Sequence, residues 1–204
     1  MSTRERFERI CRFEKPDRPP RWETYGFWKS TIARWHAEGM PAEIDAGSIR
    51  GYFGMDRRPV LPVNSGLTLP PLFQEFMLPY YREYISCCKT LGIKHFMVDS
   101  DGNNDVLLPL FIEAGVNIFS PFEVPAGNDV REVRKRYPEL VIAGGIDKRS
   151  LFEDFDAIRR EVDRVVPWMW ERGGYFPSLD HSTPPNVPLK NWEFYLQYIR
   201  SLFA

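Results

Sequence analysis

Acidic side chains recur at four places in this sequence, each time at or shortly after the end of a short apolar segment. With two basic neighbours they form one set: Asp99, Asp101, Glu123, Asp147, Lys148, Asp180 and His181. Carboxylates and an imidazole can transfer protons, coordinate a metal ion or bind the polar groups of a substrate. Their recurrence at one kind of place predicts a reactive site.

The members of this set differ in the chemistry that we expect of them. The catalytic candidates are Asp99, Asp101, Glu123, Asp147 and His181. The substrate-binding candidates are Lys148, Asp180 and Tyr25. A structural alternative stays open for each acid, because an aspartate or glutamate in such a loop can cap the next helix. Lys148 can equally pair with a neighbouring carboxylate.

The four apolar segments are short and do not alternate with polar residues, which is typical of strands covered on both faces. The predicted strands are residues 95–98, 116–119, 140–143 and 174–177. The predicted helices are residues 73–91, 105–114, 130–137 and 155–172, with a final helix at 192–203. Helices that alternate with strands favour a parallel sheet, whose strands all end at one edge. We therefore expect the acids and His181 to face one cleft.

Residues 1–58 differ from the rest of the chain in composition, because they are rich in tryptophan and tyrosine and show no clear strand pattern. We expect a first helix over residues 3–13 with Thr3 as its N-cap, and helical spacing recurs at 27–36 and 42–51. Residues 59–71 contain four prolines and predict an extended connector. The expected organisation is an N-terminal helical segment (1–58), this connector (59–71) and four βα units (72–204).

Composition limits the classes of partner. The chain has 204 residues, of which 43% are hydrophobic and 27% charged, with a net charge of -1, so we expect one globular domain. Without a block of like charge we expect neither a nucleic-acid nor a membrane partner, and a small-molecule substrate becomes the default. Three cysteines, no signal peptide and no apolar run of about 20 residues predict a reducing, cytoplasmic location.

Several blocks of the sequence resemble the uroporphyrinogen decarboxylase superfamily, which also contains the corrinoid and coenzyme M methyltransferases. The blocks are TRERFERICRFEKPDRPPRW, GYFGMDRRPV, FMVDSDGN, NIFSPFEVPAGNDVREVRKRYPEL, VIAGGIDK and GGYFPSLDHSTPPNVPLKN. The order of these blocks is more specific than any one of them. The resemblance implies a (β/α)8 barrel with its active site in a deep cleft at the carboxyl ends of the strands.

The chain is too short for that barrel, which takes roughly 250 residues. Family members carry further barrel strands after the GYFGMD block, so the sequence resembles a member with an internal deletion near residues 69–72. The expected fold is α/β: an incomplete TIM-type (β/α) barrel of about four parallel βα units plus the N-terminal helical segment. The strand at 95–98 would then be an open sheet edge, and we expect a homodimer to cover it.

The decarboxylase branch matches this sequence only in part. The resemblance implies that porphyrinogen decarboxylases bind a polycarboxylate with N-terminal arginines, use an early aspartate and tyrosine, and keep a late histidine. His181 matches the histidine, but the segment Glu23-Thr24-Tyr25-Gly26-Phe27 occupies the arginine motif, and the segment for the aspartate and tyrosine is missing. A highly anionic substrate would also be repelled by the acids of the candidate set.

The methyltransferase branch implies a zinc site with a His-x-Cys-Gly motif after a strand and a later Cys-x-x-Pro-Pro loop. Here Asp99-Ser100-Asp101-Gly102 and His181-Ser182-Thr183-Pro184-Pro185 occupy these positions. We therefore predict that Asp99, Asp101 and His181 bind a divalent metal, with zinc expected and Glu123 or water completing the site. The alternative stays open that these acids bind substrate or cap helices.

Three functions follow from this reading. The first is methyl transfer from a small substrate to a thiol or to a corrinoid held by a partner protein, with the metal as Lewis acid. The second is decarboxylation of a porphyrinogen or a smaller carboxylic acid, which needs no cofactor. The third is an inactive half-barrel that serves as a binding or assembly module.

Overall fold

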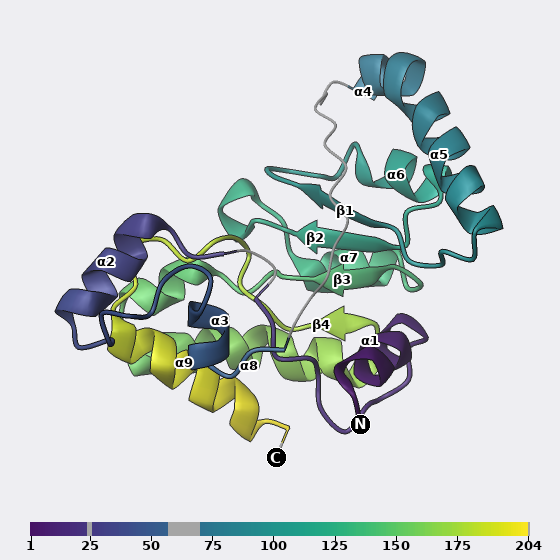
Figure 1. The fold of residues 1–204 in the computed structure, drawn as a ribbon. Coiled ribbons are helices and arrows are strands. Elements are labelled where there is room, and N and C mark those ends of the chain that lie inside the picture. The colour runs from purple at the N-terminus through teal and green to yellow at the C-terminus, as the bar shows by residue number, and fades with distance from the viewer. Residues whose placement is uncertain (24–25, 57–69, 204) are drawn as a thin grey trace.

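A four-stranded parallel sheet organises the computed structural model, which describes residues 1–23, 26–56 and 70–203 (Figure 1). The strands are β1 (Met97–Ser100), β2 (Ile118–Pro121), β3 (Val141–Ala143) and β4 (Tyr175–Phe176). They pair in chain order, β1-β2-β3-β4. The predicted α/β fold with four parallel units is confirmed, and the sheet is open. Tyr25 and most of the connector at 59–71 lie outside the described residues.

Helices precede each strand and follow the last. The N-terminal helices are α1 (Thr3–Cys11), α2 (Lys29–Ala37) and α3 (Ile49–Tyr52). Before β1 come α4 (Pro70–Leu72), the π-helix η1 (Phe73–Met77) and α5 (Leu78–Thr90). The later α-helices are α6 (Leu108–Ala114), α7 (Val130–Arg136), α8 (Phe155–Arg172) and α9 (Leu189–Ser201). Two 3-10 helices lie in the loops, η2 (Val124–Ala126) and η3 (Lys148–Phe152).

The first two strands begin two residues later than predicted. The side chain of Asn117 accepts a hydrogen bond from the backbone N of Phe96 (2.8 Å) and donates one to Lys94 O (2.7 Å). These bonds take the place of ladder bonds, so the paired register starts at Met97 and Ile118. Because β1 also extends to Ser100, beyond the predicted end at residue 98, Asp99 lies inside the strand and not after it.

Two N-terminal predictions were wrong in detail. Helix α1 is capped by Ser2, which forms a reciprocal capping box with Glu5. The predicted cap, Thr3, instead donates its hydroxyl to Asp56 (2.9 Å). Of the predicted 42–51 helix only the last three residues are helical, as part of α3 (Ile49–Tyr52), because the Asp45 carboxylate accepts from two nearby backbone N–H groups and stabilises a turn.

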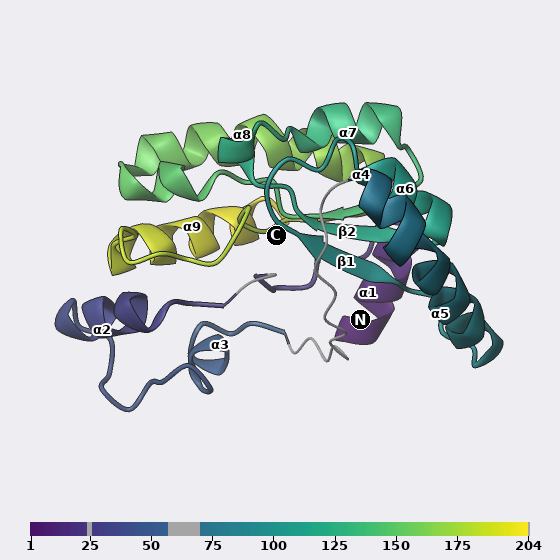
Figure 2. The same ribbon diagram turned by 90° about the horizontal axis from the view of Figure 1, so that it is seen from above.

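The sheet has a different cover on each face. Phe119, Ile142 and Tyr175 form a cross-strand row that packs into the main core with α6, α7 and α8. The opposite face, with Ile118, Val141 and Phe176, packs against Ile10 of α1 and against Trp22. Figure 2 shows α7 and α8 on one side of the strands and α1 on the other.

The N-terminal segment is joined to the last βα unit and is not a separate body. Phe27 forms a parallel bridge with Thr183. Trp35 donates its indole N–H to Val187 O (2.9 Å) and stacks on Trp192 of α9. Both tryptophans are fully buried. One hydrophobic core therefore holds the N-terminal and C-terminal parts together.

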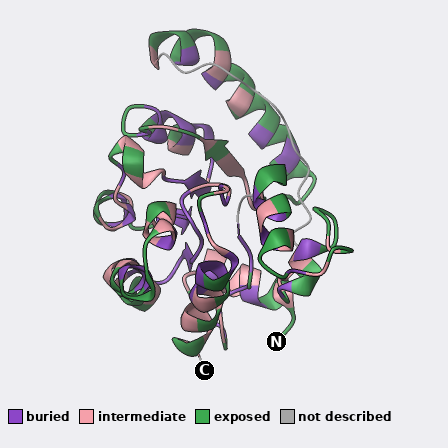
Figure 3. Cartoon of the chain, turned by 90° about the vertical axis from the view of Figure 1, so that its left-hand side faces the viewer, coloured by how far each residue is buried: buried purple, intermediate pink, exposed green. Residues whose placement is uncertain are grey.

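Strand β1 forms one edge of the sheet, and the helix beside it carries exposed apolar side chains. The side chains along α4, η1, α5 and its C-terminal turn, here called the α5 stripe, are Leu72, Phe76, Tyr80, Tyr84 and Leu91. Figure 3 shows the buried strands β2, β3 and β4 inside the molecule and exposed residues on the surrounding helices, whereas β1 is only partly buried. The homodimer that we predict at this edge stays a prediction.

Two further features bear on the sequence analysis. In the part of the chain that the structure describes, no helix is long and apolar enough to cross a membrane. Cys11, Cys87 and Cys88 are free thiols.

Candidate functional site at the strand ends

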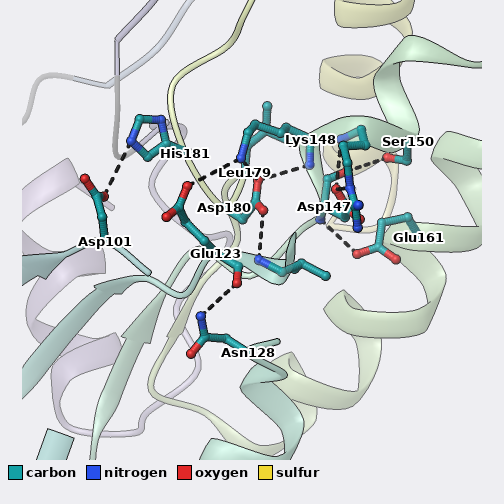
Figure 4. Close-up of polar contacts among 12 residues, drawn as sticks. Asp101, Glu123, Asn128, Asp147, Lys148, Ser150, Glu161, Leu179, Asp180 and His181 are labelled. Carbon is teal, nitrogen blue, oxygen red and sulfur yellow. Dashed lines mark hydrogen bonds and ion pairs between the residues drawn. The ribbon is translucent and has the colours of Figure 1, made fainter. Parts of the chain in front are cut away.

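The loops after the four strands meet around Lys148 (Figure 4). The backbone N and the Nζ of Lys148 lie 3.1 Å and 3.3 Å from Oδ1 of Asp180. The same Nζ lies 3.8 Å from Oε1 of Glu123. We call Lys148, Asp180 and Glu123, with the Asp101 and His181 pair beside them, the strand-end network.

Asp180 is the buried anchor of this network. Its side chain is fully buried, and its second oxygen accepts a hydrogen bond from Val124 N (2.9 Å). Burial raises the pKa of Asp180, while the ammonium of Lys148 and the two backbone N–H groups oppose that rise. One carboxyl thus fixes the loops after β2, β3 and β4 relative to one another.

Glu123 ties the loop after β1 to the same point. Its Oε2 accepts a hydrogen bond from Gly102 N (2.8 Å). The amide of Asn128 then donates both to Glu123 O (2.7 Å) and to Gly102 O (2.8 Å). All four loops are therefore connected through hydrogen bonds to Glu123 or Asp180.

Two glycines allow the loops to approach so closely. A Cβ on Gly144 would lie 2.0 Å from Pro121 O, and one on Gly145 would lie 2.3 Å from Cγ1 of Val130. Both glycines have positive φ angles, 108° and 79°. The Gly144-Gly145 pair thus serves backbone packing between the β2 and β3 loops.

His181 and Asp101 form a second polar pair beside Lys148. Nε2 of His181 lies 3.5 Å from Oδ1 of Asp101, and their side chains are 26% and 66% exposed. Figure 4 shows this pair next to Glu123. The loops after β1 and β4 thus bring these two side chains together, and their partial exposure leaves the pair open to solvent.

Asp147 departs from the cleft that we expected it to share with His181. Its carboxylate caps η3 by accepting from Arg149 N (2.9 Å) and pairs with the Arg149 guanidinium (2.7 Å). Burial raises the pKa of Asp147, but these bonds outweigh it and hold the pKa below its usual value. With Arg149, Glu161 and Arg164 it lines a separate cavity of about 400 Å³ against α8. The contacts of Asp147 therefore agree with the alternative that an acid in such a loop caps the next helix.

The predicted metal ligands do not assemble into a three-ligand site. Asp99 is exposed on the edge strand β1, while Asp101 and His181 lie together beyond its end. Among the residues that the structure describes, no three His, Cys, Asp or Glu side chains are grouped so that they could hold one metal ion. Zinc sites in proteins use at least three such ligands. Among the described residues, the predicted donor set therefore does not fit zinc.

A buried glutamate that the sequence analysis did not single out lies behind the network. Glu23 accepts hydrogen bonds from Leu179 N (2.8 Å) and from the hydroxyl of Tyr195 (2.9 Å). Burial raises its pKa to about 7, against the opposing effect of these two bonds. Since Leu179 immediately precedes Asp180, Glu23 positions the backbone of the network. In the sequence, the only indication of this role is an acidic residue directly after Trp22, in a segment rich in aromatic residues.

Comparison with known proteins confirms the resemblance. The family model described as uroporphyrinogen decarboxylase (URO-D) matches residues 63–202. The chain is 26% identical over 140 residues to a protein named uroporphyrinogen decarboxylase from Trichlorobacter lovleyi, and this covers 67% of the chain and 39% of that protein. To the protein of that name from Syntrophotalea carbinolica it is 27% identical over 139 residues, covering 67% and 39%.

A third relative extends further along the chain. The protein of the same name from Geotalea daltonii is 22% identical over 171 residues, which cover 83% of the chain and 46% of that protein. The chain thus spans less than half the length of these curated relatives.

Proposed function

Because the chain belongs to the uroporphyrinogen decarboxylase family, we propose that its strand-end network transfers a methyl group from a small neutral or cationic substrate to a thiol or to the corrinoid of a partner protein. This proposal rests on the excess of acidic over basic groups in the network. Asp101, Glu123 and Asp180 contribute three carboxyl groups against the single ammonium of Lys148.

This charge balance disfavours a polycarboxylate substrate. The ammonium of Lys148 is already shared between Asp180 and Glu123, so it offers little net positive charge to an incoming anion. Like charges in a partly buried site repel strongly, since the effective dielectric is lower there than in water. A neutral or cationic methyl donor meets no such barrier.

The exposed pair supplies the proton that methyl transfer from a neutral donor needs. When the bond between the methyl carbon and the oxygen or sulfur of a neutral donor breaks, the electron pair stays on the heteroatom, which then takes up a proton. We assign this proton to His181, whose Nε2 lies 3.5 Å from Oδ1 of Asp101. A cationic donor leaves as a neutral group and needs no proton, and a thiol acceptor releases its own proton to solvent as its sulfur bonds to the methyl carbon. Lys148, Asp180 and Glu123 act as positioning residues, because they hold the loops that carry His181 and Asp101.

The experiment uses methyl donors labelled with carbon-13 and follows the methyl resonance by NMR. The purified protein is incubated with methanol, methoxyarenes, methyl thioethers or methylated amines, and with 2-mercaptoethanesulfonate or reduced cobalamin as acceptor. The proposal predicts a new enzyme-dependent methyl resonance for at least one pair of donor and acceptor. No transfer with any pair, while the protein is folded, contradicts it.

Decarboxylation is the second candidate, and two observations favour it. The three relatives described above carry the name uroporphyrinogen decarboxylase, and the Lys148 ammonium is a group that binds carboxylates. Release of carbon dioxide from uroporphyrinogen III or from a smaller carboxylic acid, without methyl transfer, would replace our first proposal with this one. A folded protein that performs neither reaction would support the third alternative, a half-barrel used for binding or assembly.

A further inference from the structure

A second cavity, of about 430 Å³, lies between the segment that leads into Glu23 and the C-terminal half of α9. Its described lining consists of residues 18–23, Met55, Pro177 and residues on one side of α9 and just after it. None of the side chains of the strand-end network lines it. Its volume is in the range that small-molecule sites occupy in proteins.

Three arginines line this cavity, Arg18, Arg21 and Arg200. Arg18 is neutralised by Asp56, with 2.8 Å between Nη1 and Oδ2. Arg200 donates from Nη2 to the backbone oxygen of Phe53. Burial lowers the pKa of Arg200, and the positive charges of Arg21 and Arg18 lower it further. The cavity therefore concentrates positive charge.

Arg21 and Arg200 have no carboxylate partner among the residues that the structure describes. The backbone N–H of Arg21, and not its guanidinium, donates to Asp56 (2.7 Å). Glu23 also lines the cavity, but its two oxygens are occupied by Leu179 N and the Tyr195 hydroxyl. Two arginines that line one cavity are thus available to pair with an anion from solution.

Most of the remaining lining is apolar, although Gln197, Ser201 and Tyr195 also contribute to it. The apolar side chains are Trp22, Met55, Pro177, Leu196, Ile199 and Phe203. Trp22 is buried, and it packs against Phe176 of β4 with 4.6 Å between ring centroids. A bare inorganic anion would leave these walls in contact with water, whereas an alkyl chain or a ring would cover them.

We propose that this cavity binds a small amphipathic carboxylate, with its head group between Arg21 and Arg200 and its apolar part against Trp22 and α9. Guanidinium groups bind carboxylates through paired charge-assisted hydrogen bonds, which gives the head group its orientation. The inference is independent of the proposed methyl transfer, because it uses none of the residues assigned to that reaction.

Isothermal titration calorimetry with decanoate tests this site. Decanol carries the same chain without the charge, and acetate carries the charge without the chain. We expect saturable binding of decanoate to the unmodified protein and at least tenfold weaker binding of both reference compounds. Equal affinity for decanol, or no saturable binding of decanoate, overturns the proposal.

Charge-removing variants locate the site. We expect Arg21→Gln and Arg200→Gln each to weaken decanoate binding about tenfold or more, as the loss of a charged hydrogen bond implies. Arg4→Gln is the matched control, because Arg4 lies exposed on α1 away from the cavity, and it should bind as the unmodified protein does. If Arg200→Gln does not fold, Arg21→Gln decides the question, since its side chain is exposed. Unchanged affinity in Arg21→Gln contradicts the proposal.

Discussion

The Nζ of Lys148 lies 3.3 Å from Oδ1 of Asp180, a carboxyl group that has no exposed surface. This single contact links the loop after β3 to the loop after β4. It also makes the ammonium responsible for keeping a buried carboxylate charged. The strand-end network therefore depends on both partners, and its loss should be visible in stability as well as in activity.

Replacing Lys148 by methionine should expose that dependence. We expect Lys148→Met to lower the free energy of unfolding by about 3 to 5 kcal/mol at neutral pH, because Asp180 is left buried without its counter-charge. The loss should shrink as the pH falls and Asp180 takes up a proton. Urea unfolding measures both effects. Lys135→Met, which removes an exposed partner of Glu132, is the control and should change stability by less than about 1 kcal/mol.

Arg134 should matter for stability although it lies outside the site. Its buried guanidinium donates to four backbone oxygens, those of Pro138, Leu140, Gly173 and Gly174. Arg134→Met leaves these acceptors buried without donors, so we expect a loss of about 3 kcal/mol or more in thermal or urea unfolding. A loss below about 1 kcal/mol would show that water replaces the guanidinium.

Glu23 should make stability depend on pH. Its pKa is about 7 in the folded protein against a usual value of 4.5, so the folded state holds a proton that the unfolded state releases between these values. The unfolding free energy should therefore fall by about 3 kcal/mol as the pH rises through this window. The groups that face this carboxyl are Leu179 N, the hydroxyls of Tyr195 and Tyr175, and Arg50.

Glu23→Gln checks this expectation, because an amide does not titrate. Urea unfolding at about pH 4.5 and about pH 8 should show a smaller pH dependence in the variant than in the unmodified protein. Glu75→Gln, on the exposed side of η1, should keep the full dependence. Identical pH profiles for Glu23→Gln and the unmodified protein would refute the assignment.

The α5 stripe should mediate self-association. We expect the protein to be a dimer in size-exclusion chromatography with light scattering, because a second copy would cover the stripe and the edge of β1. Tyr80→Glu and Tyr84→Glu, which place a charge on side chains 70% and 47% exposed, should give monomers. Tyr52→Glu, on the exposed side of α3, should remain dimeric. A folded monomer of the unmodified protein would contradict this prediction.

The elements of the sheet were predictable because their signals are local. A short run of apolar residues marks a strand such as 140–143, and apolar residues at helical spacing mark an amphipathic helix such as α8. The late start of β1 was not predictable, since it depends on an amide of Asn117 that reaches Lys94 and Phe96 across the sheet. A side chain that replaces ladder bonds has no signature in composition.

The candidate site was predictable in its location and only partly in its contacts. Lys148, Asp180 and Glu123 meet because parallel strands end at one edge. Asp147 has the same position relative to its strand, yet Arg149 two residues later takes its carboxylate. Glu23 reaches the network from more than 150 residues away in sequence, so only the tertiary fold reveals its contact with Leu179.

The rate of methyl transfer in His181→Asn tests the central proposal most directly. The carbon-13 assay is run with the best pair of neutral donor and acceptor, beside His36→Asn as the control. The ring of His36 lies outside the strand-end network, with its Nε2 2.8 Å from the backbone oxygen of Ile44. We predict a fall of about 100-fold or more for His181→Asn, the usual contribution of general acid catalysis, and an unchanged rate for His36→Asn. Equal rates in both variants would contradict the assignment of the strand-end network as the site of the reaction.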